Sequence, residues 1–368
     1  MQEKKKNRII FIDLMRAFAV LMMVQGHTVD SLLADDYRTF DSLIYHFWFF
    51  MRGLTAPIFL FSAGTVFTYL LRLDPTPFSQ NVRVKKGLKR FLMLLGLGYL
   101  LRYPTPYIVY FGKVNQEQWN TFFTVDVLHL IGFGLLFTIL FSWVAEKFRL
   151  RDSIVYSLGA FMFFILYPVF AKIEWTNFLP VPVAAYFYQG TGSLFPLFPW
   201  VAYLLSGAVL GSYLARNPDV FRTKKFSLDL ALFGMLFLLI SAVGNWLELA
   251  IYNESNFWTT SPNLVIFRIG YVLMLNSIVS YISISIRNIP QLLIHIGRNT
   301  LPIYVVHLVI LYGSAWTLGF SYFFGHSFSL LSTIACAVIM LLLMVSMVQS
   351  FQVVKKKIKQ RSLAAQNA

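Results

Sequence analysis

Long apolar stretches alternate with short charged segments along the whole chain. Each stretch holds about 20 residues, the length that an α-helix needs to cross the hydrocarbon core of a bilayer. Ten of them are expected, at residues 9–30, 42–71, 87–103, 121–144, 152–171, 195–215, 226–250, 262–286, 291–313 and 327–354. The pattern predicts an all-α integral membrane protein, a polytopic bundle of about ten transmembrane helices.

Two prolines interrupt this pattern, and the connecting segments are short. Pro57 predicts a kink in the second span, and Pro302 predicts a break in the ninth. The longest outer segments, 104–120 and 172–194, are too short to fold alone. We therefore predict a single membrane domain over residues 1–368, with basic tails at 1–8 and 355–368.

Composition agrees with a bilayer as the solvent. Hydrophobic residues make up 57% of the chain, charged residues make up 13%, and the mean hydropathy is +0.64. Soluble domains average about 25% charged residues. The net charge of +15 raises the question of nucleic-acid binding, but the basic residues lie beside apolar spans and form no continuous basic face. Nucleic acid is thereby disfavoured, and acidic lipid headgroups are the expected counter-charge. The single cysteine, Cys336, gives no disulfide framework.

Lysine and arginine gather in alternate loops, which predicts the orientation. One set of loops holds most of them, whereas the other set holds only Arg38, Lys113 and Lys172. The positive-inside rule places the basic set in the cytoplasm. With an even number of spans, both termini are then cytoplasmic. The simple loop pattern favours a bacterial cytoplasmic membrane.

Several ionisable residues fall in or near the spans, where burial costs roughly 2.5–3.5 kcal/mol each. Snorkelling near a helix end accounts well for Arg52 and Arg102. The basic members outside the loops are Arg16, Arg52, Arg102, Arg268 and Arg298.

The first span carries the most informative spacing. Asp13 and Arg16 are three residues apart and share a face. Arg16 and His27 are eleven apart, which leaves their side chains about 20° out of line and about 16 Å apart along the axis. The spacing alone leaves two interpretations open: a functional polar stripe, or two buried polar residues satisfied by neighbouring helices.

The segment FIDLMRAFAVLMMVQGH resembles the first-helix signature of transmembrane acyltransferases, with Asp, then Arg and, after ten intervening residues, His. Further resemblances follow in order along residues 8–313: APIFLFSAG, VKKGLKRFLMLL, DVLHLIGFGLL, FPLFPWVAYLLSGAVLG and IGRNTLPIYVVHLVIL. They are similar to the acyltransferase-3 family and to the heparan-glucosaminide acetyltransferase-like branch. In animal relatives the helix-one position can hold Asn, with the working His in the next loop. This chain has His27 and no histidine in 28–45.

The resemblance implies acyl transfer across the bilayer, with acyl-CoA entering from the cytoplasm. It points to an O- or N-acyltransferase, most simply an acetyltransferase, acting on a cell-envelope glycan, glycolipid or small molecule. His27 would act as base, and Arg16 and Arg298 would meet pantetheine or phosphate groups. The adenosine phosphates would meet basic residues at the mouth of the third span: Lys86, Lys89 and Arg90. No cofactor is expected to be tightly bound, because acetyl-CoA or another acyl-CoA serves as co-substrate.

Other histidines are weighed below His27. Asp126 and His129 are three residues apart, which predicts a second acid–base pair or a hydrogen-bonded helix joint. His307 is a candidate for shaping the acceptor site. His46 lies among aromatics, where an anchor role competes with acceptor binding.

A transporter or flippase for a small polar or lipid-linked substrate is the alternative function, since intramembrane charge and broken helices suit transport equally well. No metal-ligand spacing such as HExxH occurs. The expected partners are acyl-CoA, the acceptor and membrane lipids. A homodimer is one of the oligomeric states that the sequence leaves open.

Overall fold

A computed structural model describes residues 9–286 and 288–366. It is mainly helical, and the one small sheet in the described residues is the antiparallel pair β1 (Gly313–Ser314) and β2 (Thr317–Leu318). The prediction of an all-α polytopic membrane protein is confirmed. The predicted basic tail at residues 1–8 lies outside the described residues.

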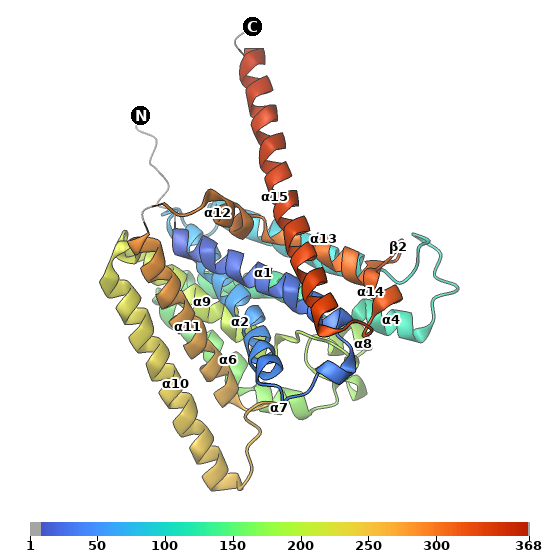
Figure 1. Ribbon diagram of the computed structural model, residues 1–368. Helices are drawn as coiled ribbons and strands as arrows, with labels where there is room; N and C mark the ends of the chain where they lie inside the picture. Colours follow the sequence, from blue (N-terminus) through green and yellow to red (C-terminus); the bar gives the residue numbers. More distant parts are fainter. Residues whose placement is uncertain (1–8, 287, 367–368) are drawn as a thin grey trace. The chain divides into compact units, whose positions relative to one another are not determined.

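Every predicted span corresponds to a helix or to a pair of helices (Figure 1). Among the described residues, eight helices are long and apolar enough to cross a membrane, or nine if one bent pair is a single span. The remaining predicted span, the third, is α3, whose first turns carry five basic residues: Arg83, Lys85, Lys86, Lys89 and Arg90. The longer helices are α1 (Ile10–Leu32), α2 (Leu43–Arg72), α3 (Val82–Leu101), α5 (Val127–Lys147), α6 (Asp152–Ile165), α9 (Leu197–Arg216), α10 (Lys224–Tyr252), α11 (Pro262–Ser285), α13 (Thr300–Tyr312) and α15 (Leu330–Gln366). The shorter ones are α4 (Gln116–Phe123), α7 (Tyr167–Lys172), α8 (Val181–Ala184), α12 (Gln291–Arg298) and α14 (Phe320–Phe324).

The fourth span begins later than its hydropathy predicts. Residues 121–123 belong to α4, whose first turn is closed by a capping box between Asn115 and Gln118. The span itself, α5, begins at Val127 because the Asp126 side chain caps its N-terminus. Hydropathy alone missed this boundary, since FF and VDVLHL read as one apolar run.

The ninth span is broken, as Pro302 predicted. Helices α12 and α13 meet at Asn299 with a bend of 73°. A proline removes the hydrogen bond to the carbonyl four residues earlier and clashes with it. For Pro302 that carbonyl belongs to Arg298, the last residue of α12.

The chain divides into two compact units. Unit 1 comprises residues 1–12 and 56–287, and unit 2 comprises residues 13–55 and 288–368. Two of the three divisions fall inside α1 and α2, so both helices contribute to both units. The sequence predicted a single membrane domain over residues 1–368, and this stays a prediction.

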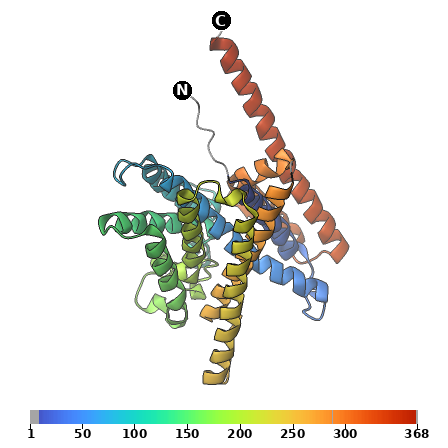
Figure 2. The ribbon, with the colours of Figure 1, turned by 90° about the vertical axis from the view of Figure 1, so that its left-hand side faces the viewer.

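Unit 1 is built by close helix contacts. A Cβ on Gly207 of α9 would lie 1.9 Å from the Phe61 carbonyl oxygen of α2, and one on Gly64 would lie 1.9 Å from that of Leu204. Glycine therefore lets these two backbones touch, a device that is common in membrane helix packing. Helices α10 and α11 lie side by side in both views (Figures 1 and 2).

Unit 2 has its own apolar core. Side chains from α1, α12, α13 and α15 pack together there, and they include Val20, Val24, Ile303 and Met344. This core holds α1 and α13 against each other, and these two helices carry most of the predicted site residues of unit 2.

Candidate functional site

The helix break at Asn299 packs against the start of α1 and gathers charged residues there. The Arg16 guanidinium donates from Nη2 to Thr300 Oγ1 over 3.0 Å. Arg298 Nε lies 3.9 Å from a carboxylate oxygen of Asp13, which is 8% exposed. A Cβ on Gly297 would lie only 1.9 Å from the Asp13 carbonyl oxygen. The structure thus brings Arg16 and Arg298 to one place; we call Asp13, Arg16, Arg298 and Thr300 the cation cluster.

A second polar group lies further along α1. The rings of His27 and His307 are 5.5 Å apart between centres, and the Tyr312 hydroxyl lies 3.3 Å from His27 Nδ1. His307 is fully buried, whereas His27 is half-buried. His307 Nδ1 lies 2.8 Å from the Ile303 carbonyl oxygen. A carbonyl only accepts, so this contact places the proton of a neutral His307 on Nδ1. We call His27, His307 and Tyr312 the imidazole cluster.

Helices α1 and α13 connect the two clusters. Thr300, at the start of α13, meets Arg16, whereas Tyr312, at its end, meets His27. The two helices therefore run in the same direction. Along α1 the eleven residues from Arg16 to His27 span about 16 Å, about half of the hydrocarbon thickness. Between the clusters, Val20 and Val24 contribute to the apolar core.

Asp30 makes the polar contacts at the end of unit 2 that is predicted to be outer. Its carboxylate pairs with Arg52, and its carbonyl accepts from Arg38, which also donates to the Leu33 carbonyl. The snorkelling expected for Arg52 is thus replaced by an ion pair. His46 is exposed at the start of α2, with its ring edge-on to Phe40 at 5.7 Å. This contact favours its interpretation as an interfacial anchor.

In unit 1, Asp126 and His129 interact, but through backbone groups at the start of α5 rather than through a direct contact of their side chains. Asp126 Oδ1 accepts from the Val127 N–H, and the Asp126 N–H donates to His129 Nδ1 over 3.1 Å. His129 is fully buried, and its Nε2 has no hydrogen-bond partner among the residues that the structure describes. Since Nδ1 accepts, the proton of the neutral ring lies on Nε2. This capping box favours the helix-joint interpretation.

Aromatic residues enclose His129. Its ring centre lies 4.4 Å from that of Tyr99, and a Cβ on Gly98 would lie 2.5 Å from the ring. The hydroxyls of Tyr99 and Tyr186 are 2.8 Å apart. Burial and this hydrogen bond raise the pKa of Tyr186, which lies outside the spanning helices, so its hydroxyl stays protonated. Arg102 Nη2 lies 3.3 Å from Asp126 Oδ2, an ion pair where snorkelling was expected.

The basic residues predicted for the adenosine phosphates are exposed on α3 of unit 1. These are Lys86, Lys89 and Arg90. They belong to a different unit from Arg16 and Arg298.

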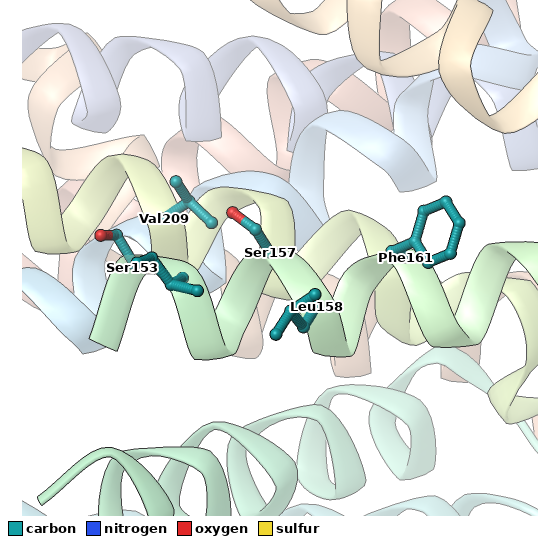
Figure 3. A pocket seen from close by; sticks show the side chains of 6 residues that line it. Ser153, Ser157, Leu158, Phe161 and Val209 are labelled. Atoms are coloured by element: carbon teal, nitrogen blue, oxygen red, sulfur yellow. The ribbon is translucent and has the colours of Figure 1, made fainter. Parts of the chain in front are cut away.

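A shallow hollow of about 550 Å³ lies on unit 1 between α6 and α9 (Figure 3). It is lined by Ser153, Ile154, Ser157, Leu158, Phe161 and Val209. None of the predicted site residues lines it. Its walls are largely apolar, so it offers little that would orient a polar substrate.

Sequence reasoning missed two partners of the predicted residues. Thr300 is 284 positions from Arg16, and Tyr312 is 285 positions from His27. Tyr312 is five residues beyond His307, about 140° around an ideal helix, so no same-face pattern marks it. Only the packing of α13 on α1 reveals the two contacts.

The family model of the heparan-alpha-glucosaminide N-acetyltransferase catalytic domain matches residues 8–253. The match includes Arg16, His27, Asp126 and His129. No curated protein matches the chain significantly.

Proposed function

The chain belongs to the family of the heparan-alpha-glucosaminide N-acetyltransferase catalytic domain, and from this we propose that it is a membrane-bound, acyl-CoA-dependent acyltransferase. It moves an acyl group, in the first place acetyl, from cytoplasmic acyl-CoA to a hydroxyl or amine on the outer side of the membrane. The acceptor is a glycan, a glycolipid or a small molecule. The family description makes glucosamine at the end of an oligosaccharide the first acceptor to try.

The cation cluster suits the donor. Arg298 is partly exposed and lies near Asp13, and Arg16 donates to Thr300 at the same helix break. Guanidinium groups bind phosphates and carbonyl oxygens through several directed hydrogen bonds. We assign the phosphopantetheine part of acyl-CoA to this cluster. The assignment of Lys86, Lys89 and Arg90 of unit 1 to the adenosine phosphates stays a prediction from the sequence.

The imidazole cluster suits the chemistry. His27 takes the proton from the acceptor hydroxyl or amine while the acceptor attacks the thioester carbonyl. The carbon–sulfur bond breaks, the new carbon–oxygen or carbon–nitrogen bond forms, and the proton returns from His27 to the CoA thiolate. For Nε2 to act as the base, Nδ1–H of His27 donates to the Tyr312 hydroxyl, and their 3.3 Å separation permits this.

One observation carries the proposal. A single helix, α13, contacts α1 at both ends, through Thr300 to Arg16 and through Tyr312 to His27. A donor site and a base thereby lie on one helix pair about 16 Å apart along the axis. The apolar residues between them, including Val20 and Val24, would keep water away from the thioester.

Asp126 and His129 take a different part in the proposal. The Asp126 N–H occupies the only lone pair on the His129 ring, at Nδ1. We therefore assign them to the start of α5, where they position the surrounding tyrosines, rather than to proton transfer.

Calorimetric titration of the detergent-purified protein with acetyl-CoA tests the proposal. We expect saturable binding, weakened roughly 10- to 100-fold in Arg16→Gln, because hydrogen bonds to charged groups contribute about 1.5–3 kcal/mol. Arg222→Gln is the matched control, since that arginine is exposed and forms an ion pair with Asp219, three residues earlier in the chain. A folded protein without affinity for acetyl-CoA or a longer acyl-CoA would favour the transporter alternative.

A further inference from the structure

Arg268 is a cation inside a spanning helix. It lies six residues after Pro262, the first residue of α11, which places it about 9 Å below the predicted outer end of that helix. Its side chain is half-buried. Within residues 9–286 and 288–366, no carboxylate lies within 4.0 Å of it, although the other membrane arginines Arg52, Arg102 and Arg298 each have one. An intramembrane cation without a counter-charge is costly and points to a functional site.

Two other elements of unit 1 converge on this guanidinium. Arg268 Cζ lies 5.8 Å from the centre of the Trp200 ring on α9. It also interacts electrostatically with Tyr203, one turn further along α9, and with Tyr167 at the start of α7. The rings of Trp200 and Tyr203 are 5.6 Å apart, and the Tyr167 hydroxyl donates to the Thr259 carbonyl over 2.9 Å. The aromatic side chains thus form a wall beside the guanidinium and leave its charge uncompensated.

The Tyr203 hydroxyl is a second polar group of the site. Tyr203 is 1% exposed; the Arg268 guanidinium can donate to its hydroxyl oxygen, but the hydroxyl proton has no acceptor within the part of the chain that the structure describes. A buried hydroxyl whose proton has no acceptor is destabilising. The guanidinium can only donate, and the phenol still has a proton to donate, so one acceptor with a negative charge would satisfy both of them.

We propose that Arg268 and Tyr203 bind a phosphate-type oxyanion from the outer leaflet, with Trp200 and Tyr167 forming the sides of the site. A phosphate accepts from a guanidinium and a hydroxyl at once and supplies the missing charge. The depth of Arg268, just below the end of the span, matches a phosphate that is attached to a lipid. This site goes beyond acyl transfer and does not depend on it, because it shares no residue with the cation cluster or the imidazole cluster.

Native mass spectrometry of protein released from nanodiscs tests the site. Nanodiscs are made with phosphatidylglycerol as the phosphate probe, or with added diacylglycerol as a matched lipid without phosphate. We expect the wild-type protein to retain one phosphatidylglycerol in preference to diacylglycerol. Arg268→Gln should lower that occupancy at least tenfold, whereas the exposed-arginine control Arg222→Gln should leave it unchanged.

Two further experiments separate loss of the site from loss of the fold, and a lipid phosphate from a free anion. Tyr203→Phe removes one oxygen only and should lower the occupancy several-fold, so it decides the question if Arg268→Gln fails to fold. Excess inorganic phosphate distinguishes the sources: displacement of the lipid identifies a site for the free anion, and no displacement identifies a site for a lipid phosphate. Equal phosphatidylglycerol occupancy in wild type, Arg268→Gln and Tyr203→Phe would overturn the proposal.

Discussion

His27 in unit 2 and His129 in unit 1 differ in what their ring nitrogens contact. His27 is half-buried and lies beside two side chains from another helix, His307 and Tyr312. His129 is fully buried, and its Nδ1 accepts from the backbone of its own helix terminus. Each histidine follows an acidic residue on or at the start of an apolar helix, so the two look alike in the sequence.

The difference separates a reactive imidazole from a structural one. A general base needs a lone pair that can reach the substrate. The lone pair of His129, on Nδ1, accepts a hydrogen bond from the Asp126 N–H, and its buried Nε2–H faces Gly98 and Tyr99. The His27 side chain is half-buried, so part of it stays exposed. The Tyr312 hydroxyl can hold the His27 ring in the tautomer that a general base requires.

The largest expected effect separates the histidines directly. His27→Gln should lower acetyl transfer to the glucosamine-terminated probe at least 100-fold, since general-base catalysis contributes roughly 10²–10⁴-fold. Its affinity for acetyl-CoA should stay close to that of the wild type. His129→Gln should retain transfer within about tenfold. The measurement is transfer of radiolabelled acetyl in proteoliposomes, and the reverse ranking of the two variants would contradict the contrast.

Gly297→Ala tests the close approach that builds the cation cluster. The added Cβ would meet the Asp13 carbonyl oxygen at 1.9 Å, so α12 must move away from α1. We expect a loss of about 1–3 kcal/mol in the free energy of unfolding and weaker acetyl-CoA binding. Gly96→Ala is the matched control, since a Cβ there meets nothing within 4 Å. Equal unfolding curves for the two variants would show that the contact contributes nothing.

Asp126→Ala tests the structural role of the other region. Removal of a helix N-cap costs about 0.5–2 kcal/mol, and the loss is increased here because Arg102 is left without its carboxylate. Asp126→Asn keeps a capping oxygen and should lose less. Denaturant titration followed by circular dichroism measures both. Acetyl-CoA affinity should not change in Asp126→Asn, and a large loss of affinity there would move Asp126 into the donor site.

Tyr312→Phe should have the smallest effect. It removes one hydrogen bond to His27, which is worth about 0.5–1.5 kcal/mol, or roughly a two- to tenfold loss of transfer rate. Because the ring remains, stability and acetyl-CoA affinity should be unchanged. Tyr99→Phe is the equivalent change beside His129 and should leave the rate unchanged. A slower Tyr99→Phe enzyme with an unaffected Tyr312→Phe enzyme would reverse the assignment.

The helices of this fold could be predicted from the sequence, and most of the contacts could not. Hydropathy located helices at all ten expected positions because bilayer thickness sets the length of a span, and eight or nine of the described helices are long and apolar enough to cross a membrane. Pro302 located the break at Asn299. The start of α5 was misplaced because the Asp126 cap interrupts a run that hydropathy reads as continuous. The spacing of Arg16 and His27 predicted one polar face. Thr300, Tyr312 and the ion pairs of Arg52 and Arg102 depend on which helices pack together, and no local pattern encodes that.

The most direct test of the proposed mechanism separates the two substrates across a membrane. Proteoliposomes are loaded with the glucosamine-terminated probe, and radiolabelled acetyl-CoA is supplied outside to the molecules whose basic loops face outward. We predict that labelled, acetylated probe accumulates inside the sealed vesicles, at a rate that His27→Gln lowers at least 100-fold. Product that forms only when both substrates share one compartment would contradict transfer along α1 from the cation cluster to the imidazole cluster.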